Sequence, residues 1–173
     1  CEMNRTDRGI RIKNRRGRGG YVKNIDIHGL KMTDVPYPLV ANCYYRCGIS
    51  DAELSGASSL DAMPVEETTP EVESISICSI RATGVKVGVT LMGLPESPIR
   101  DFRMEDWSVE TLPGFSPDNP VIPAMDLSDT EVSISGIYAR NVRNLNTIDI
   151  KLNGQDLCSD DMDIISPETK PSA

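Results

Sequence analysis

Two cationic side chains, Arg11 and Lys13, stand one residue apart in a short run that alternates with apolar residues. In a β-strand, residues two apart point to the same face, so both cations lie on one side while Ile10 and Ile12 face a core. Arginine offers a planar fork of donors and lysine offers a point charge, and together they suit an anionic ligand. The pair is therefore a candidate for binding an anion from a strand, with ordinary surface ion pairs as the alternative.

The charge of the chain is uneven along its length. Residues 1–24 contain eight basic and two acidic residues, a net charge of +6, whereas the whole chain has −8, which leaves −14 for the remainder. An anionic partner is therefore expected at the basic end.

The elements that position these cations are predicted to be strands. Helical periodicity is nearly absent, and short alternating or β-branched runs recur between clusters of Gly, Pro, Asn and Asp. Three runs share a repeat with apolar residues at offsets 0, 3, 5, 8 and 10 and begin at Val22, Val72 and Ile99, and a weaker fourth copy, with threonine at offset 5, begins at Val142. Each copy is expected to give two short strands separated by a tight bend.

Further apolar runs lie between these copies, at residues 39–41, 87–91 and 132–134, and they predict another strand in each repeat. Stacked repeats pair each strand with its counterpart and form one apolar column. The sequence therefore predicts an all-β parallel β-helix. A β-sandwich is disfavoured because Asn153-Gly154 is the only good hairpin dipeptide.

Insertions at residues 49–70 and 112–130 interrupt the repeat, and long loops on a rigid scaffold often form the walls of a binding cleft. Residues 1–158 are assigned to the stacked strands, and the acidic residues 159–173 to a flexible tail. No apolar run approaches the roughly 20 residues that span a bilayer, so no membrane partner is expected.

The five cysteines do not predict a metal site or a compartment. Cys43 and Cys47 lack a second cysteine pair, and His28 is far from them in sequence, so buried thiols are the preferred interpretation. No metal or cofactor is expected.

The Arg11-Ile12-Lys13 segment resembles the Arg-Ile-Lys signature of the polygalacturonases, glycoside hydrolase family twenty-eight. The resemblance extends over residues 9–13, 17, 19–20 and 22–25, and residues 93–99 and 136–142 are similar to segments of bacterial members. It implies a right-handed, pectin-lyase-like parallel β-helix, of which this chain is the C-terminal coils. It also implies a pectin- or polygalacturonate-degrading hydrolase that acts with inversion and is secreted or periplasmic.

The resemblance implies substrate-binding roles for three residues. Arg11 and Lys13 would bind the carboxylate of a galacturonate unit beside the scissile bond. Tyr45 would lie near that bond, where a phenol can hydrogen-bond and stack, with Tyr44 as its inward or stacking neighbour. The partner is then an anionic polysaccharide. Ordinary surface ion pairs and a tyrosine packed for its area remain the alternatives.

The catalytic signatures of the family, Asn-Thr-Asp, Asp-Asp and Gly-His-Gly, precede the Arg-Ile-Lys motif and are not present in this sequence. Residues 146–149, Asp160-Asp161 and His28-Gly29 imitate them out of order, and we assign no catalytic role to them. The chain is expected to be a fragment without the catalytic aspartates, inactive on its own.

Two other interpretations compete with this one. Residues 15–20 form an Arg-Gly segment of the kind that binds nucleic acid, but Tyr21 is the only aromatic residue beside it, and the rest of the chain is acidic. The second is a non-catalytic β-helix that only binds polysaccharide, which the upstream sequence would distinguish by lacking paired aspartates.

Overall fold

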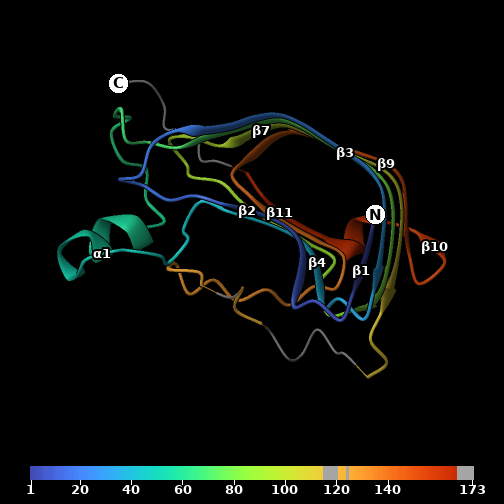
Figure 1. The fold of residues 1–173 in the computed structure, drawn as a ribbon. Helices are drawn as coiled ribbons and strands as arrows, with labels where there is room; N and C mark the ends of the chain where they lie inside the picture. Colours follow the sequence, from blue (N-terminus) through green and yellow to red (C-terminus); the bar gives the residue numbers. More distant parts are fainter. Residues whose placement is uncertain (115–120, 124, 167–173) are drawn as a thin grey trace.

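The computed structural model describes residues 1–114, 121–123 and 125–166, and most of them form parallel β-strands in two sheets (Figure 1). The six-stranded sheet contains, in spatial order, β1 (Glu2–Asn4), β3 (Tyr21–Thr33), β5 (Glu71–Val85), β7 (Ile99–Thr111), β9 (Val142–Leu152) and β10 (Gln155–Asp156). The five-stranded sheet contains β11 (Met162–Ile165), β8 (Ile137–Arg140), β6 (Val89–Met92), β4 (Tyr37–Asn42) and β2 (Arg8–Lys13). From β1 to β9 the chain crosses between the sheets after every strand. Strand β2 is the first strand of the five-stranded sheet along the chain, and it lies at one edge of that sheet.

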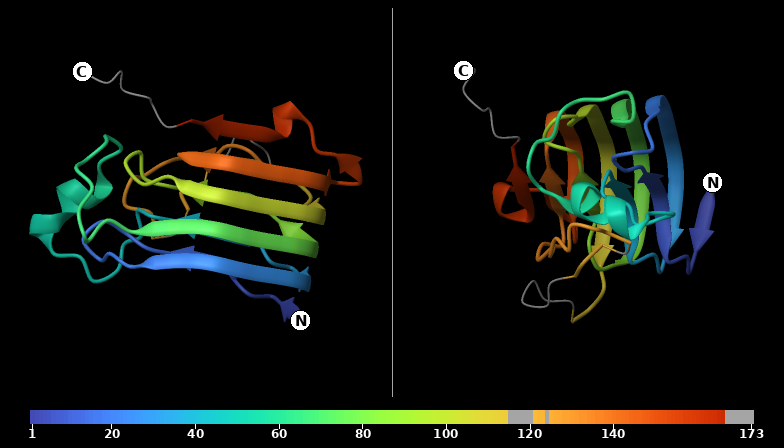
Figure 2. Two further views of the ribbon diagram at one scale, coloured as in Figure 1. Left: turned by 90° about the horizontal axis from the view of Figure 1, so that it is seen from above. Right: turned by 90° about the vertical axis from the view of Figure 1, so that its left-hand side faces the viewer.

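The two sheets face each other, and their inward side chains form the core. Figure 2 shows the long strands β3, β5, β7 and β9 side by side in one layer. Trp107 and Phe102 from β7 pack with Leu39 from β4 and Leu91 from β6, all 1% exposed or less. Because inward positions alternate with outward ones, each strand contributes apolar residues to the same column as its neighbours.

The repeat predicted from the sequence is confirmed by the register of the six-stranded sheet. Val22 pairs with Val72, Ile75 pairs with Phe102, and Ile99 pairs with Val142, so the four copies lie on top of one another. The positions at equal offsets therefore form continuous rows across the sheet.

Each long strand bends twice, at offsets 2 and 7 of the repeat. The bends have a left-handed backbone, with φ between 51° and 67°, and they occur at Asn24, Ser74, Asp101 and Asn144 in one row and at Gly29, Ser79, Asp106 and Asp149 in the other. Glycine and short polar residues tolerate this conformation best. The sequence predicted two short strands separated by one bend in each copy. In the structure each copy forms one long strand with two bends.

Three segments differ from the sequence-based assignment. Residues 132–134 were predicted as a strand, but Val132 pairs antiparallel with Val121 in the loop, and residues 137–140 form the strand β8 instead. Helix α1 (Asp51–Ser58) lies in the first insertion and begins with a capping box between Ser50 and Glu53. Residues 159–165, assigned to the flexible tail, form a 3₁₀ turn and strand β11, which pairs parallel with β8.

The hairpin signal at Asn153-Gly154 is confirmed. Both residues have positive φ, and the turn joins β9 to the short antiparallel strand β10. The second insertion falls partly on residues 115–120 and 124, and the end of the predicted tail falls on residues 167–173, which lie outside the described residues.

Candidate functional site

The three residues singled out in the sequence meet in the structure. Nη2 of Arg11 donates a hydrogen bond to Oη of Tyr45 at 2.8 Å. The guanidinium carbon of Arg11 lies 4.7 Å from the centre of the Tyr45 ring, and Nζ of Lys13 lies 5.3 Å from the same point. The aromatic ring is thus faced by two cations, an arrangement that its negative π-face favours.

Strand pairing sets this geometry. Arg11 and Lys13 point outward from β2, because Ile10 and Ile12 on either side of Arg11 pack against the core. Tyr45 follows β4, and its backbone N–H donates to the carbonyl of Asn14 at 3.1 Å. The register of β2 and β4 therefore delivers the tyrosine to the two cations.

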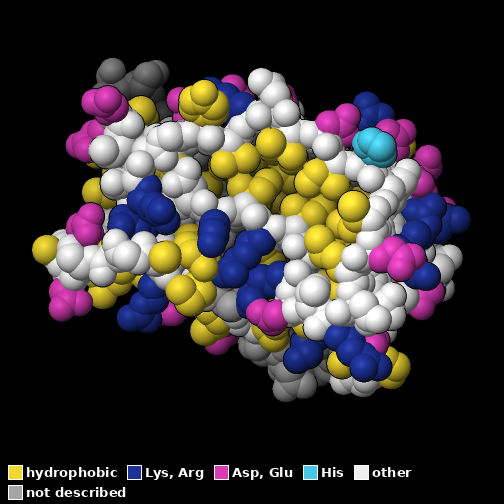
Figure 3. All heavy atoms as spheres, in the orientation of Figure 1, with side chains coloured by type: hydrophobic (Ala, Val, Ile, Leu, Met, Phe, Trp, Pro, Cys, Tyr) yellow, Lys and Arg dark blue, Asp and Glu magenta, His cyan; other side chains and the backbone are white. Residues whose placement is uncertain are grey.

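The site has an accessible side and a packed side. Lys13 is exposed and Arg11 is partly buried, whereas Tyr45 is only 6% exposed. Among the described residues, neither Arg11 nor Lys13 has an acidic partner within ion-pair distance. Figure 3 shows lysine and arginine side chains gathered near the middle of one face of the molecule, beside an area of hydrophobic side chains.

A second cation–aromatic pair, which was not predicted from the sequence, extends the site. The guanidinium carbon of Arg8 lies 5.5 Å from the centre of the Tyr37 ring, and Arg8 is paired with the exposed carboxylate of Asp7. Burial and then the neighbouring charge of Arg11 lower the pKa of Arg8. Arg8 and Tyr37 are direct partners in the register of β2 and β4, and this pairing is the feature from which their contact could have been predicted.

Polar contacts behind the site hold the tyrosine segment in place. The side chain of Asn42 accepts a hydrogen bond from the backbone N–H of Tyr44 at 2.6 Å and donates to Asp126 at 3.3 Å. Asp126 also accepts from Ser128 Oγ and from the backbone N–H of Thr130. These bonds anchor the segment after β4 to the second insertion, and they occupy the oxygens of Asp126.

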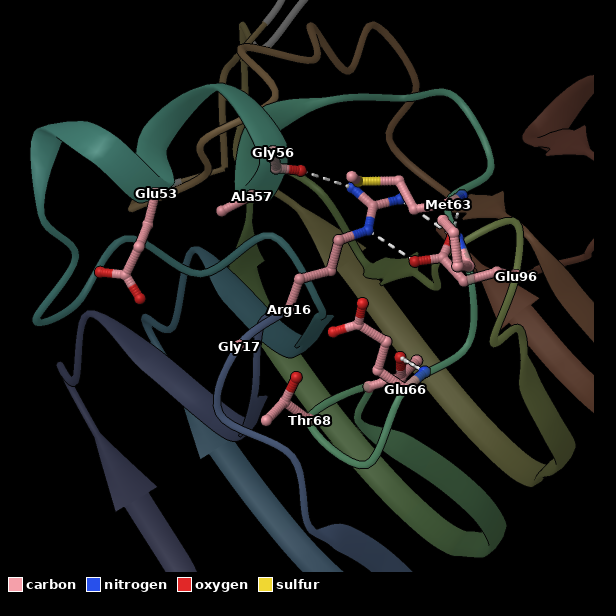
Figure 4. Close-up of a pocket in the computed structure, with 11 residues that line it drawn as sticks. Arg16, Gly17, Glu53, Gly56, Ala57, Met63, Glu66, Thr68 and Glu96 are labelled. Atoms are coloured by element: carbon pink, nitrogen blue, oxygen red, sulfur yellow. Dashed lines mark hydrogen bonds and ion pairs between the residues drawn. The ribbon is translucent and has the colours of Figure 1, made fainter.

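The first insertion is held by a buried ion pair. Arg16 donates through Nε and Nη2 to both oxygens of Glu96 and through Nη1 to the carbonyl of Gly56 (Figure 4). Its other N–H groups donate to the carbonyls of Ser59 and Asp61. All five donors of the guanidinium are therefore satisfied.

A cavity of about 220 Å³ lies between this pair, helix α1 and residues 63–69 (Figure 4). The guanidinium of Arg16 also lies 5.5 Å from the centre of the Tyr44 ring. Arg16 thus connects the insertion to the residue that precedes Tyr45. No local pattern in the sequence links Arg16 to Glu96, so this contact could not be predicted from it.

The Arg-Gly segment directs most of its charge inward. Arg15 and Arg16 are buried and donate to backbone carbonyls, including those of Cys47 and Gly48 for Arg15. Arg18 is the exposed cation of this segment. This geometry leaves two of its three arginines engaged within the protein.

The imitations of catalytic motifs lie away from the three site residues. Residues 146–149 and His28 are on strands of the six-stranded sheet, whereas Arg11 and Lys13 are on the five-stranded sheet. Asp160 and Asp161 belong to the 3₁₀ turn after β10. None of them is brought to Tyr45.

The cysteines differ in their exposure to solvent. Cys43 is buried, and burial raises its pKa to about 12, so its thiol stays protonated at neutral pH. Cys1, Cys47 and Cys158 are exposed, so the expectation of buried thiols holds for Cys43 alone among these four. Within the residues that the structure describes, no group of three or more His, Cys, Asp or Glu side chains is placed to hold a metal ion.

Comparisons of the chain with family models, curated proteins and solved structures gave no match. In the described part of the chain, no helix has the length and apolar character needed to cross a membrane.

Proposed function

We propose that the chain is the substrate-binding part of a pectin-degrading glycoside hydrolase of the polygalacturonase type. In this proposal the two parallel sheets are the C-terminal coils of a right-handed β-helix, and the protein is secreted or periplasmic, as the resemblance implies. The ligand is an anionic polysaccharide with galacturonate units. The site itself uses no cofactor.

One observation carries the proposal: Arg11 and Lys13 flank Tyr45 without an acidic partner among the described residues. The carboxylate of a sugar acid supplies the missing partner for either cation, and a charge-assisted bond of this kind is stronger than a neutral one. The phenol oxygen of Tyr45 accepts from Arg11, which leaves its O–H free to donate to the ligand. The cationic start of an otherwise acidic chain also attracts a polyanion.

Hydrolysis requires a pair of free carboxyl groups, which the described residues do not place beside Tyr45. An inverting glycosidase uses two carboxyl groups about 6.5 to 9.5 Å apart, one to protonate the leaving oxygen and one to activate water. The two buried carboxylates that support the site, Glu96 and Asp126, are both engaged in hydrogen bonds within the protein. The chain alone should therefore bind the polymer and release no reducing sugar. Measurable hydrolysis by the chain alone would contradict this division of roles.

Calorimetric titration with oligogalacturonate and its methyl ester tests the binding role. Lys13→Met should lower the affinity for oligogalacturonate about tenfold to a hundredfold, because it removes a charge-assisted bond worth roughly 1.5 to 3 kcal/mol. The loss should be much smaller for the methyl ester. Lys31→Met is the matched control, since Lys31 is an exposed cation on the six-stranded sheet.

Equal losses for both ligands would mean that Lys13 does not recognise a carboxylate, and the proposal would be withdrawn. Binding without hydrolysis even in the longer protein that carries the upstream coils would favour the alternative, a β-helix that only binds polysaccharide.

A further inference from the structure

Another cation, Arg140, lies on the same face of the five-stranded sheet as Lys13 and is half-buried. Arg140 ends β8, where Ile137 and Ala139 point into the core, so Arg140 points outward. The register pairs Lys13 with Asn42, Asn42 with Met92, and Met92 with Arg140. Lys13 and Arg140 therefore lie in one row, three strand spacings or about 14 Å apart, and the row continues beyond Arg140 to Ile165 on β11.

The middle of this row is covered. Asn42 is 2% exposed and Met92 is fully buried, so no ligand reaches the sheet between the two cations. Arg140 therefore belongs to a site of its own and is not part of the cluster around Tyr45.

Arg140 faces a cavity of about 530 Å³. Its walls come from the first insertion, from the segment after β6 and from the end of β11. Leu60, Pro95 and Ile165 give an apolar surface, and Asp61 and Ser166 supply polar groups. This combination of a cation, hydroxyl-binding groups and an apolar surface matches a sugar that also carries a carboxylate.

The side chain of Arg140 is held in place but not neutralised. Its Nε donates to Oη of Tyr138 at 3.0 Å, and Tyr138 is itself buried. Within residues 1–114, 121–123 and 125–166, the terminal nitrogens Nη1 and Nη2 make no hydrogen bond and no ion pair. A pre-oriented planar fork with both outer nitrogens open is the geometry that binds a carboxylate at two points.

We propose that this cavity is a second binding site for a uronate unit, with the carboxylate on the fork of Arg140 and the sugar hydroxyls on Asp61 and Ser166. The class of ligand rests on the proposed function, whereas the site rests on the cavity and on Arg140. Lys13 and Arg140 then hold two different sugar units.

Side-chain Nε–H and backbone amide NMR signals of the chain, titrated with sodium galacturonate, separate the two sites. The Nε–H signal of Arg140 and the amide signal of Ser166 should shift with galacturonate, and they should shift far less with galactose or with sodium acetate. Arg140→Gln should weaken the response at Ser166 at least about tenfold, since it removes a charge-assisted two-point contact. The Arg11 signal should respond as in the unmodified chain, which also shows that the variant is folded.

No shift at Arg140, or equal shifts with acetate and galacturonate, would overturn the second site. If Arg11 responds while Arg140 does not, the proposed function stands and this inference fails. If Arg140 responds while Arg11 does not, the second site stands and the role proposed for Arg11 and Lys13 fails.

Discussion

Arg16 and Glu96 form a two-point ion pair, with Nε 2.6 Å from Oε1 and Nη2 2.9 Å from Oε2. Their side chains are only 10% and 4% exposed. Arg16→Met should therefore lower the free energy of unfolding by about 3 to 5 kcal/mol, because it leaves the carboxylate of Glu96 buried without a counter-charge. Urea unfolding measures this loss. The exposed neighbour gives the control, since Arg18→Met should change the stability by less than about 0.5 kcal/mol. A similar small change for both variants would show that the pair does not hold the first insertion.

The hydroxyl of Tyr44 is buried and has no hydrogen-bond partner in the part of the chain that is described. Tyr44→Phe should therefore leave the stability at pH 7 unchanged or raise it by up to about 1 kcal/mol, since it removes an unsatisfied polar atom. Burial raises the pKa of Tyr44 to about 12, above the ordinary value of about 10. The unfolded state thus loses this proton first, and stability falls as the pH rises from about 10 to about 12.

Denaturant titrations at pH 7.5 and pH 11 test this prediction. Tyr44→Phe should reduce the alkaline loss of stability and leave the part due to Cys43, whose pKa burial also raises. Tyr21→Phe is the control, because the Tyr21 side chain is exposed and should not change the pH dependence. An unchanged alkaline loss in Tyr44→Phe would mean that the phenol is hydrated in solution.

The ring and the hydroxyl of Tyr45 should contribute separately to ligand binding. Tyr45→Phe keeps the aromatic face for Arg11 and Lys13 but removes a hydrogen bond worth roughly 0.5 to 1.5 kcal/mol, so the affinity for oligogalacturonate should fall about two- to tenfold. Tyr45→Leu should cost more, because the cations lose the ring that orients them. Calorimetry of both variants against the unmodified chain gives the comparison. If Tyr45→Leu binds as well as Tyr45→Phe, the ring has no orienting role.

Backbone conformation, and not contact, should decide the effect of substitutions on the outer face of β5. Ser74 has a φ of 56°, whereas Ser76 lies in the extended part of the same strand. Ser74→Val should destabilise by about 1 to 2 kcal/mol, because a β-branched side chain is strained at positive φ. Ser76→Val should be nearly neutral, since valine suits an extended strand. Thermal unfolding of the two variants gives the measurement, and equal losses would show that the bend relaxes.

The sequence predicted the stacked strands because their register depends on a regular pattern. Inward positions of neighbouring strands must all be apolar, so the copies at Val22, Val72, Ile99 and Val142 could be aligned without a structure. The bends were underestimated because glycine, asparagine, aspartate and serine also occur in ordinary turns. Helix α1 gave almost no signal, since Ala57 is its one buried residue.

The candidate site could be predicted in part. Arg11 and Lys13 were singled out because they lie two apart on a predicted strand within a segment that resembles the Arg-Ile-Lys signature, and Tyr45 was singled out through that resemblance alone; the structure brings the three together. Arg16, Glu96 and Arg140 were not found, because their partners are set by long-range packing and no local spacing marks them.

The spacing of the stacked repeats has a consequence for the order of folding. The paired positions of β3 and β5 are 50 residues apart, those of β5 and β7 are 27 apart, and those of β7 and β9 are 43 apart. Closing the shortest of these loops costs about 0.5 kcal/mol less entropy than closing the longest. The β5–β7 pairing therefore has the lowest entropic cost of these three pairings of long strands. In the five-stranded sheet β2 pairs with β4 at a separation of only 29 residues (Arg8 with Tyr37), so the pairing that brings Tyr45 to Arg11 and Lys13 costs about the same loop entropy and belongs to the early contacts of folding.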